Sequence, residues 1–222
     1  MVERVEQCSR AEDPIERVGQ WIACSDEPVL LAMDAPLGWP QRLADELSGH
    51  RAGRPLRSSA NHLFRRATDE FVKEKVGKQP LDVGADRIAR TAHSALEFLK
   101  RLEERLGKTI EMAWDQDFRG VRAIEVYPAA TLKVHGIDTR GYKAPDRMDL
   151  RKRVLAEVST RLEIRAEVHD LEKRSDTVDA VACILAGHDF LAQDCYSPPA
   201  GSVSKKEGWI WVRRADGSVT SG

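Results

Sequence analysis

Two short apolar runs, each carrying an acid, have the pattern of buried strands. The first, Val29–Met33, is apolar throughout and is followed by Asp34 and an Ala-Pro turn. The second, Val121–Pro128, is rich in β-branched residues, follows a glycine and ends at a proline. Such runs predict strands of a parallel sheet that is covered on both faces.

Between and around these strands, apolar residues recur at helical spacing. The pair Asp13-Pro14 predicts a helix start, because aspartate is a good N-cap and proline fits the first turn. A further strand is predicted at Trp209–Val212. The alternation of helices and strands indicates an α/β fold. The other predicted helices are Arg42–Leu47, Asp86–Leu106, Ala129–Val134, Asp146–Leu162 and a last helix that begins near Ser175.

The acids of the first two strands are candidates for a site. Asp34 stands at the carboxyl end of its strand, which is the edge where open α/β sheets bind ligands. The alternative is that Asp34 only opens the following turn. Glu125 lies inside a buried strand, where a carboxylate is costly unless it is paired or binds a metal. The alternative for Glu125 is a structural ion pair with an arginine.

The last predicted helix has two acids near its start. Asp176 and Asp179 are three residues apart and are therefore neighbours on one helix face. Adjacent carboxylates repel each other, and a divalent cation would relieve that repulsion. The alternative is helix capping, because acids in a first turn complement the helix dipole. Glu207, just before the last predicted strand, is a fifth acid in a comparable place.

Together these acids predict a metal site. Carboxylates without a supporting cluster of Cys or His suit Mg²⁺ or Mn²⁺ better than zinc. Acids from two strands and one helix would converge on two ions about 3.5–4 Å apart, the arrangement that hydrolyses phosphodiesters. The chain has no GxxxxGK[ST] phosphate loop, which argues against an enzyme that transfers phosphoryl groups from a small nucleotide.

The formal net charge of −1 provides no global attraction for nucleic acid, so a polyanion would have to be held by a local patch. Arginine matches phosphate oxygens, which favours a phosphate-contacting patch beside Asp34 in the stretch 48–66. The alternative is an ordinary solvated surface. The stretch contains basic residues and no acid: His50, Arg51, Arg54, Arg57, His62, Arg65 and Arg66.

The cysteines and the hydropathy pattern indicate a cytoplasmic protein. Cys8, Cys24, Cys183 and Cys195 have no CxxC spacing and are predicted to be buried, reduced thiols. No apolar run reaches the roughly 18 residues that a membrane span needs, and the N-terminus has no signal-peptide core. We therefore expect no membrane partner.

Several stretches together resemble one known family. They are MDAPLGWP, RRATD, EVYPAATLK, GYK, SDTVDAVACILAG and EGWIWV, in this order between Val29 and Val212. They are similar to the predicted RNase H-like nucleases grouped as domain of unknown function 429. The resemblance implies a ribonuclease-H-like fold, with a mixed sheet flanked by helices. It also implies a single domain over residues 1–222, with a mostly helical insertion around residues 41–120.

The resemblance further implies an activity and a site. The SDTVDA helix is similar to the acidic D-x-x-D helix of RuvC-type resolvases. The implied function is a divalent-metal-dependent nuclease that hydrolyses nucleic-acid phosphodiester bonds. By this analogy the residues that bind Mg²⁺ or Mn²⁺ and act in catalysis are Asp34, Glu125, Asp176 and Asp179, and those that bind the nucleic acid are Arg65, Arg66 and Lys143.

One part of the superfamily pattern has no counterpart here. RNase H-like proteins begin with a hairpin of strands whose first member carries a metal-binding aspartate, and no such stretch precedes Asp34. Either the start of the chain is assigned too late, or this is a shortened member whose N-terminal hairpin strands are missing or shortened. The second case favours an alternative function, a non-catalytic RNase H-like module that binds nucleic acid or a protein.

Overall fold

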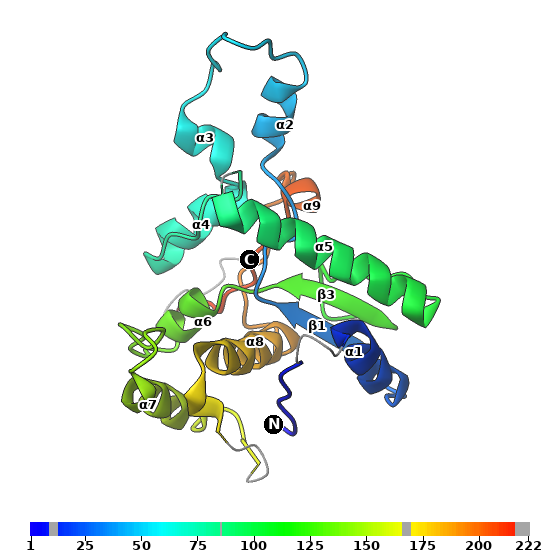
Figure 1. The fold of residues 1–222 in the computed structure, drawn as a ribbon, viewed down its shortest axis with the longest axis vertical. Helices are drawn as coiled ribbons and strands as arrows, with labels where there is room; N and C mark the ends of the chain where they lie inside the picture. Colours follow the sequence, from blue (N-terminus) through cyan, green and yellow to red (C-terminus); the bar gives the residue numbers. More distant parts are fainter. Residues whose placement is uncertain (9–12, 85, 166–169, 216–222) are drawn as a thin grey trace.

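A small parallel sheet lies at the centre of the fold (Figure 1). The computed structural model describes residues 1–8, 13–84, 86–165 and 170–215. The strand order is β1–β3–β2, with β1 at Val29–Met33, β3 at Val121–Glu125 and β2 at Glu111–Met112. The two predicted strands that carry acids are thus confirmed, although the second ends at Glu125.

Strands β1 and β3 pair in parallel, from Val29 opposite Val121 to Met33 opposite Glu125. The chain therefore leaves both strands at the same edge of the sheet. The predicted strand at 209–212 joins the sheet only through a parallel bridge between Ile210 and Glu125. The strands named above are all parallel, so the described residues do not form the expected mixed sheet.

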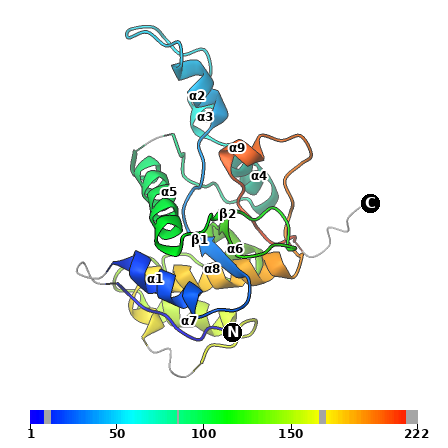
Figure 2. The same ribbon diagram turned by 90° about the vertical axis from the view of Figure 1, so that its right-hand side faces the viewer.

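Helices cover both faces of the sheet (Figures 1 and 2). Helices α1 (Pro14–Ala23) and α5 (Asp86–Leu106) cover one face, and α8 (Ser175–Leu191) covers the other. Side chains alternate across β1, so Leu31 packs toward α1 and α5, whereas Leu30 packs toward α8. The remaining helices are α2 (Gln41–Leu47), α3 (Ala60–Phe64), α4 (Ala67–Val76), α6 (Pro128–Val134), α7 (Met148–Val158), α9 (Ser204–Glu207) and the 3₁₀ turn Leu171–Lys173.

The predicted helices are confirmed, with shifts at their ends. Asp13 is the N-cap of α1, and its Oδ1 accepts a hydrogen bond from the N–H of Ile15 at 2.9 Å. Helix α7 is shorter than the predicted stretch 146–162, because Ser159 caps it and the chain then turns. Helix α3 forms inside a segment that the sequence predicts to be a loop.

The four cysteines differ in how deeply they are buried. Cys183 and Cys195 are buried and Cys8 is partly buried, whereas Cys24 is exposed because it caps the C-terminal end of α1. The prediction of a buried thiol is therefore wrong for Cys24. None of the described helices is both long enough and apolar enough to cross a membrane.

A buried ion-pair cluster around Arg66 connects the end of β3 to the neighbouring loops. The Arg66 side chain is 1% exposed, and its Nη2 lies 2.6 Å from Glu125 Oε1 and 2.9 Å from Asp69 Oδ1. Its Nη1 donates to Glu125 Oε2 at 2.8 Å and to the carbonyl of Glu207 at 3.0 Å. Glu125 Oε2 also accepts from the N–H of Leu37 at 2.9 Å. The ion-pair alternative for Glu125 is therefore confirmed.

Glu207 joins the same region from the C-terminal side. Its buried carboxylate accepts from the N–H of Gln41 through Oε1 and from the N–H of Ala67 through Oε2, each at 2.8 Å. These residues begin α2 and α4, so one carboxylate holds the N-termini of two helices, where the helix dipole favours negative charge. Gly38 passes so close that a Cβ there would lie 2.6 Å from the Glu207 backbone. Glu207 thus serves the fold instead of an acidic site.

Replacing Arg66 by methionine should destabilise the protein strongly. The substitution leaves the buried carboxylates of Glu125 and Asp69 without their cation, and breaking a buried pair in this way costs about 3–5 kcal/mol. The free energy of unfolding, measured by urea denaturation, reports the loss. Arg65→Met is the matched control, because Arg65 is partly exposed and its pair with Asp82 is worth about 0–1 kcal/mol. Equal losses in the two variants would contradict the structural role of Arg66.

Candidate functional site

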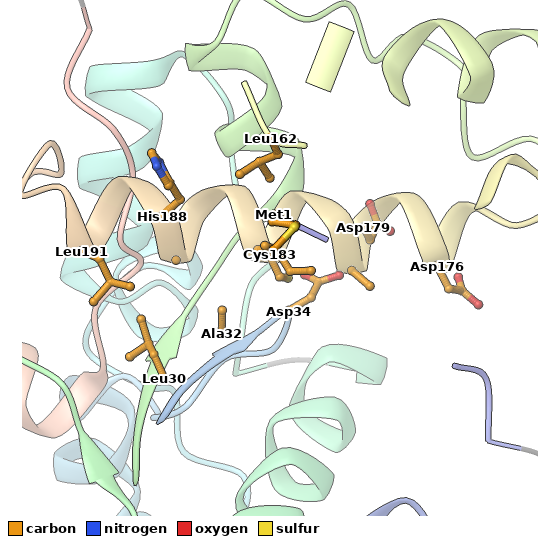
Figure 3. A pocket seen from close by; sticks show the side chains of 13 residues that line it. Met1, Leu30, Ala32, Asp34, Leu162, Asp176, Asp179, Cys183, His188 and Leu191 are labelled. Atoms are coloured by element: carbon orange, nitrogen blue, oxygen red, sulfur yellow. The ribbon is translucent and has the colours of Figure 1, made fainter. Parts of the chain in front are cut away.

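Asp34 lines two cavities at the carboxyl end of β1, and Figure 3 shows the larger one. The larger cavity, of about 670 Å³, lies between β1 and α8, and Leu30 and Ala32 contribute to its apolar lining. The smaller cavity, of about 250 Å³, is lined by Asp34, Tyr127 and Lys143 at the carboxyl ends of the strands. Asp34 is exposed to solvent, so a ligand in either cavity can reach it.

Asp179 is the acid that α8 places near Asp34. It is buried in the second turn of the helix and lines the larger cavity together with Asp34 (Figure 3). Its Oδ2 lies 2.8 Å from the Nζ of Lys143, and its Oδ1 accepts a hydrogen bond from the Tyr142 hydroxyl. The sequence therefore predicts correctly that Asp34 and Asp179 face one site, and the structure adds a cation and a phenol to them.

Asp176 lies at the rim of the same cavity. It is on the same helix face as Asp179, as the spacing predicts. Its side chain is 76% exposed, and its Oδ2 lies 3.2 Å from Nη2 of Arg174. Asp176 is therefore a peripheral member of the acidic group.

The surroundings of Asp34 raise its pKa to about 6. Neighbouring protein atoms displace water from the carboxylate, and the negative charge of Asp179 adds to this effect. The positive charge of Lys143 opposes both without cancelling them. A carboxylate with this pKa exchanges its proton near neutral pH, which suits acid–base chemistry.

Lys143 and Tyr142 hold Asp179 in place. Desolvation by itself would lower the pKa of Lys143, but the hydrogen bond to Asp179 and the negative charges of Asp179 and Asp34 together outweigh it and raise the pKa, so the ammonium stays charged. Desolvation and the hydrogen bond to Asp179 raise the pKa of Tyr142, so its hydroxyl remains a donor. The sequence predicts Lys143 as a substrate contact but not Tyr142. An aromatic residue before a lysine in a loop is a weak signal for such a role.

Two other predicted site residues, Glu125 and Arg66, line the smaller cavity together with Asp34 and Lys143. Both carboxylate oxygens of Glu125 are engaged by Arg66, so Glu125 has a structural role, and its predicted ligation of a metal ion stays a prediction. Arg66 is buried in the same ion pair, and this burial replaces its predicted contact with phosphate. Arg65 lies 3.0 Å from Asp82 Oδ1. Glu125 and Arg66 are thus paired with each other in the wall of the smaller cavity.

The predicted metal site stays a prediction, and Asp34 and Asp179 are the candidate ligands that line one cavity. Among the described residues, no group of three or more His, Cys, Asp or Glu side chains is arranged to hold a metal ion. Asp34 and Asp179 offer hard oxygen donors, and Mg²⁺ binds in many proteins through one or two carboxylates, with water and substrate phosphate completing its shell. The predicted two-ion arrangement needs Glu125, which is bound to Arg66.

A comparison with known protein families finds one match. The family described as "Protein of unknown function (DUF429)" matches residues 4–203. The chain belongs to this family. The predicted family membership is thereby confirmed, and the matched range of this DUF429 protein includes Asp34, Lys143 and Asp179. No curated protein and no solved structure matches it.

In this DUF429 protein, Asp34→Asn should be more stabilising at pH 8 than at pH 4. The fold raises the pKa of Asp34 from 3.8 to about 6, so the folded state binds this proton more tightly than the unfolded state does. The Asp34 contribution to stability therefore falls as the pH rises from about 4 to about 6, and asparagine removes that loss. Thermal unfolding midpoints of variant and wild type at both pH values test this.

Asp149 provides a control of opposite sign. Its side chain is exposed, and hydrogen bonds from Arg147 and Arg153 lower its pKa. Asp149→Asn should therefore lose a little stability relative to wild type as the pH rises. A difference between Asp34→Asn and wild type that is the same at pH 4 and pH 8 would contradict the raised pKa of Asp34.

Proposed function

We propose that this protein hydrolyses phosphodiester bonds of nucleic acid and that Asp34 is its central catalytic carboxylate. The observation that carries the proposal is the place of Asp34, at the ligand-binding edge of a parallel sheet and near a second carboxylate and a lysine. A titratable group with a perturbed pKa in a cleft is typical of a catalytic site. The resemblance to predicted RNase H-like nucleases supports the same reaction, and an RNase H-like fold is part of the proposal.

Asp34 and Lys143 have different roles in the proposed hydrolysis. With a pKa of about 6, Asp34 is mostly ionised at neutral pH and can accept a proton from the attacking water. The Lys143 side chain is 56% exposed and lines the smaller cavity, where its ammonium suits a phosphate oxygen on which charge develops. Asp179 also holds Lys143, and Tyr142, which holds Asp179, is a positioning residue.

A divalent cation is part of the proposal. Asp34 and Asp179 would hold one Mg²⁺ or Mn²⁺ ion, and when bound it supplies polarisation of a phosphoryl oxygen. Asp34 and Asp179 repel each other, which contributes to the raised pKa of Asp34. The protein thus has an electrostatic reason to bind a cation at this position.

The second candidate function is a module that binds nucleic acid without cleaving it. The observation that favours it is the ion pair between Glu125 and Arg66, which neutralises one of the expected acids. The two candidates differ in a measurable way, because a nuclease depends on Asp34 and a binding module does not.

The purified protein should cleave nucleic acid in the presence of Mn²⁺ or Mg²⁺. The substrates are single- and double-stranded DNA, RNA, a DNA–RNA hybrid and a branched junction. Asp34→Asn should lower the rate by about 100-fold or more, because general acid–base catalysis contributes about 10²–10⁴. Asp149→Asn removes an exposed acid from α7 and should leave the rate within a few-fold. Cleavage of no substrate, or equal rates for Asp34→Asn and wild type, would overturn the proposal.

Metal binding can be tested without an activity assay. Mn²⁺ should raise the thermal unfolding midpoint of the wild-type protein, because a ligand that binds the folded state stabilises it. Asp34→Asn and Asp179→Asn should each remove most of that rise, whereas Asp149→Asn should keep it. A rise of the same size in all variants would place the ion elsewhere.

A further inference from the structure

Residues 41–66 form an arm that projects from the body of the fold (Figures 1 and 2). The arm consists of α2, a loop over residues 48–59 and α3, followed by Arg65 and Arg66, and we call it the arginine arm. Residues 34–40 join it to the carboxyl end of β1, so the chain passes directly from Asp34 into the arm.

The arm is held at its base and at its tip. At the base, the Glu207 carboxylate accepts hydrogen bonds from Gln41 and Ala67, the residues where the chain enters and leaves the arm. Near the tip, Glu46 Oε2 accepts from the N–H of Arg57 at 2.8 Å. Hydrogen bonds therefore give the arm a defined conformation.

The tip of the arm presents arginines without acidic partners. Arg51, Arg54 and Arg57 are exposed, and they line one hollow of about 500 Å³ together with His50 and two acids at the end of α2, Asp45 and Glu46. Within the residues that the structure describes, none of the three guanidinium groups forms an ion pair. Arg57 lies near Glu46, but the Glu46 carboxylate is already engaged by hydrogen bonds from the loop. The three arginines outnumber the two acids, so the hollow has an excess of positive charge.

Exposed arginines of α7 and of the loop before it, unlike the three arginines of the tip, form ion pairs with acids. Arg140 lies 2.9 Å from Asp138, and Asp149 is paired with both Arg147 and Arg153, at 3.4 Å and 3.2 Å. Their positive charges are locally compensated. The tip differs from these regions because three arginines that form no ion pair with a described residue line one hollow.

The group of exposed arginines at the tip suits the phosphate backbone of nucleic acid. Guanidinium groups bind phosphate oxygens in a bidentate manner, and a local positive patch can attract a polyanion even where the net charge is −1. The arm contains no Trp or Tyr on which a base could stack, which favours contacts that do not depend on base sequence. Helix α2 spans about 10 Å, or about three base pairs of a duplex at 3.4 Å each.

We propose that the arginine arm binds the phosphate backbone of a nucleic-acid duplex through Arg51, Arg54 and Arg57. This inference rests on the proposed function and adds the surface that holds the substrate. It also explains how a protein without global positive charge holds a polyanion beside an acidic site, because the arm separates the positive hollow from the carboxylates.

Fluorescence anisotropy with labelled 20-base-pair duplexes of DNA and of RNA tests the proposal. The measurements use Asp34→Asn protein, so that no cleavage occurs, at salt concentrations from 50 to 200 mM. Combined with Asp34→Asn, the triple change R51A/R54A/R57A should weaken binding by about 10- to 100-fold at 0.1 M salt. It should also reduce the slope of log K against log salt by about 2.7, or about 0.9 for each lost phosphate contact. The matched control R140A/R147A/R153A removes the same charge and should change binding by less than about twofold.

The outcomes separate this proposal from the proposed function. If the duplexes bind and the arm variant keeps the affinity and salt slope, the arm is not the binding surface, and the cleavage results stand unchanged. If neither duplex binds, the arm proposal fails, while the cleavage assay still decides the activity. Binding to one kind of duplex alone, with the expected loss in the arm variant, supports the proposal and identifies the substrate. Thermal unfolding of both triple variants verifies that they are folded.

Discussion

The ion pair between Arg66 and Glu125 is the interaction on which this structure depends most. Both side chains are almost fully buried, and Asp69 contributes a second carboxylate, so one cation serves two anions in the interior. Such a group is stable only when its remaining donors and acceptors are satisfied. The N–H of Leu37 and the carbonyl of Glu207 complete it. The cluster thus joins the loops after both long strands to the C-terminal part of the chain.

Because of this ion pair, the two carboxylates at the same edge of the sheet, Glu125 and Asp34, have different roles. Glu125 is buried in the ion pair with Arg66, and the pair forms part of the wall of the smaller cavity. Asp34 is exposed and only partly compensated by Lys143, while desolvation and Asp179 raise its pKa. A carboxylate whose charge is fully paired stabilises a fold, whereas one whose charge is incompletely paired is available for chemistry. This difference makes Asp34 the centre of the proposed function.

Local signals in the sequence predicted much of the fold. The apolar run Val29–Met33 became a strand because both of its faces are covered, and the Asp13-Pro14 pair became a helix start because its cap needs only neighbouring residues. Asp34 was predicted as a ligand-edge acid from the strand that precedes it. The predicted strand Trp209–Val212 is reduced to a bridge at Ile210, because strand formation depends on a partner that composition does not specify.

The sequence by itself therefore determined the helices, the two main strands and the acids at their ends, because these follow from periodicity, caps and turns within a few residues. Only the tertiary structure decided which charged side chains and backbone groups contact each other. Arg66 and Glu125 are 59 positions apart, and Glu207 reaches Gln41 across 166 positions. Nothing in the local pattern distinguishes a buried arginine from a solvated one, since both look alike until the chain packs. Folding thus assigned Arg66 and Glu125 to the interior, Asp34 and Asp179 to the cavity, and Arg51, Arg54 and Arg57 to the exposed tip of the arm.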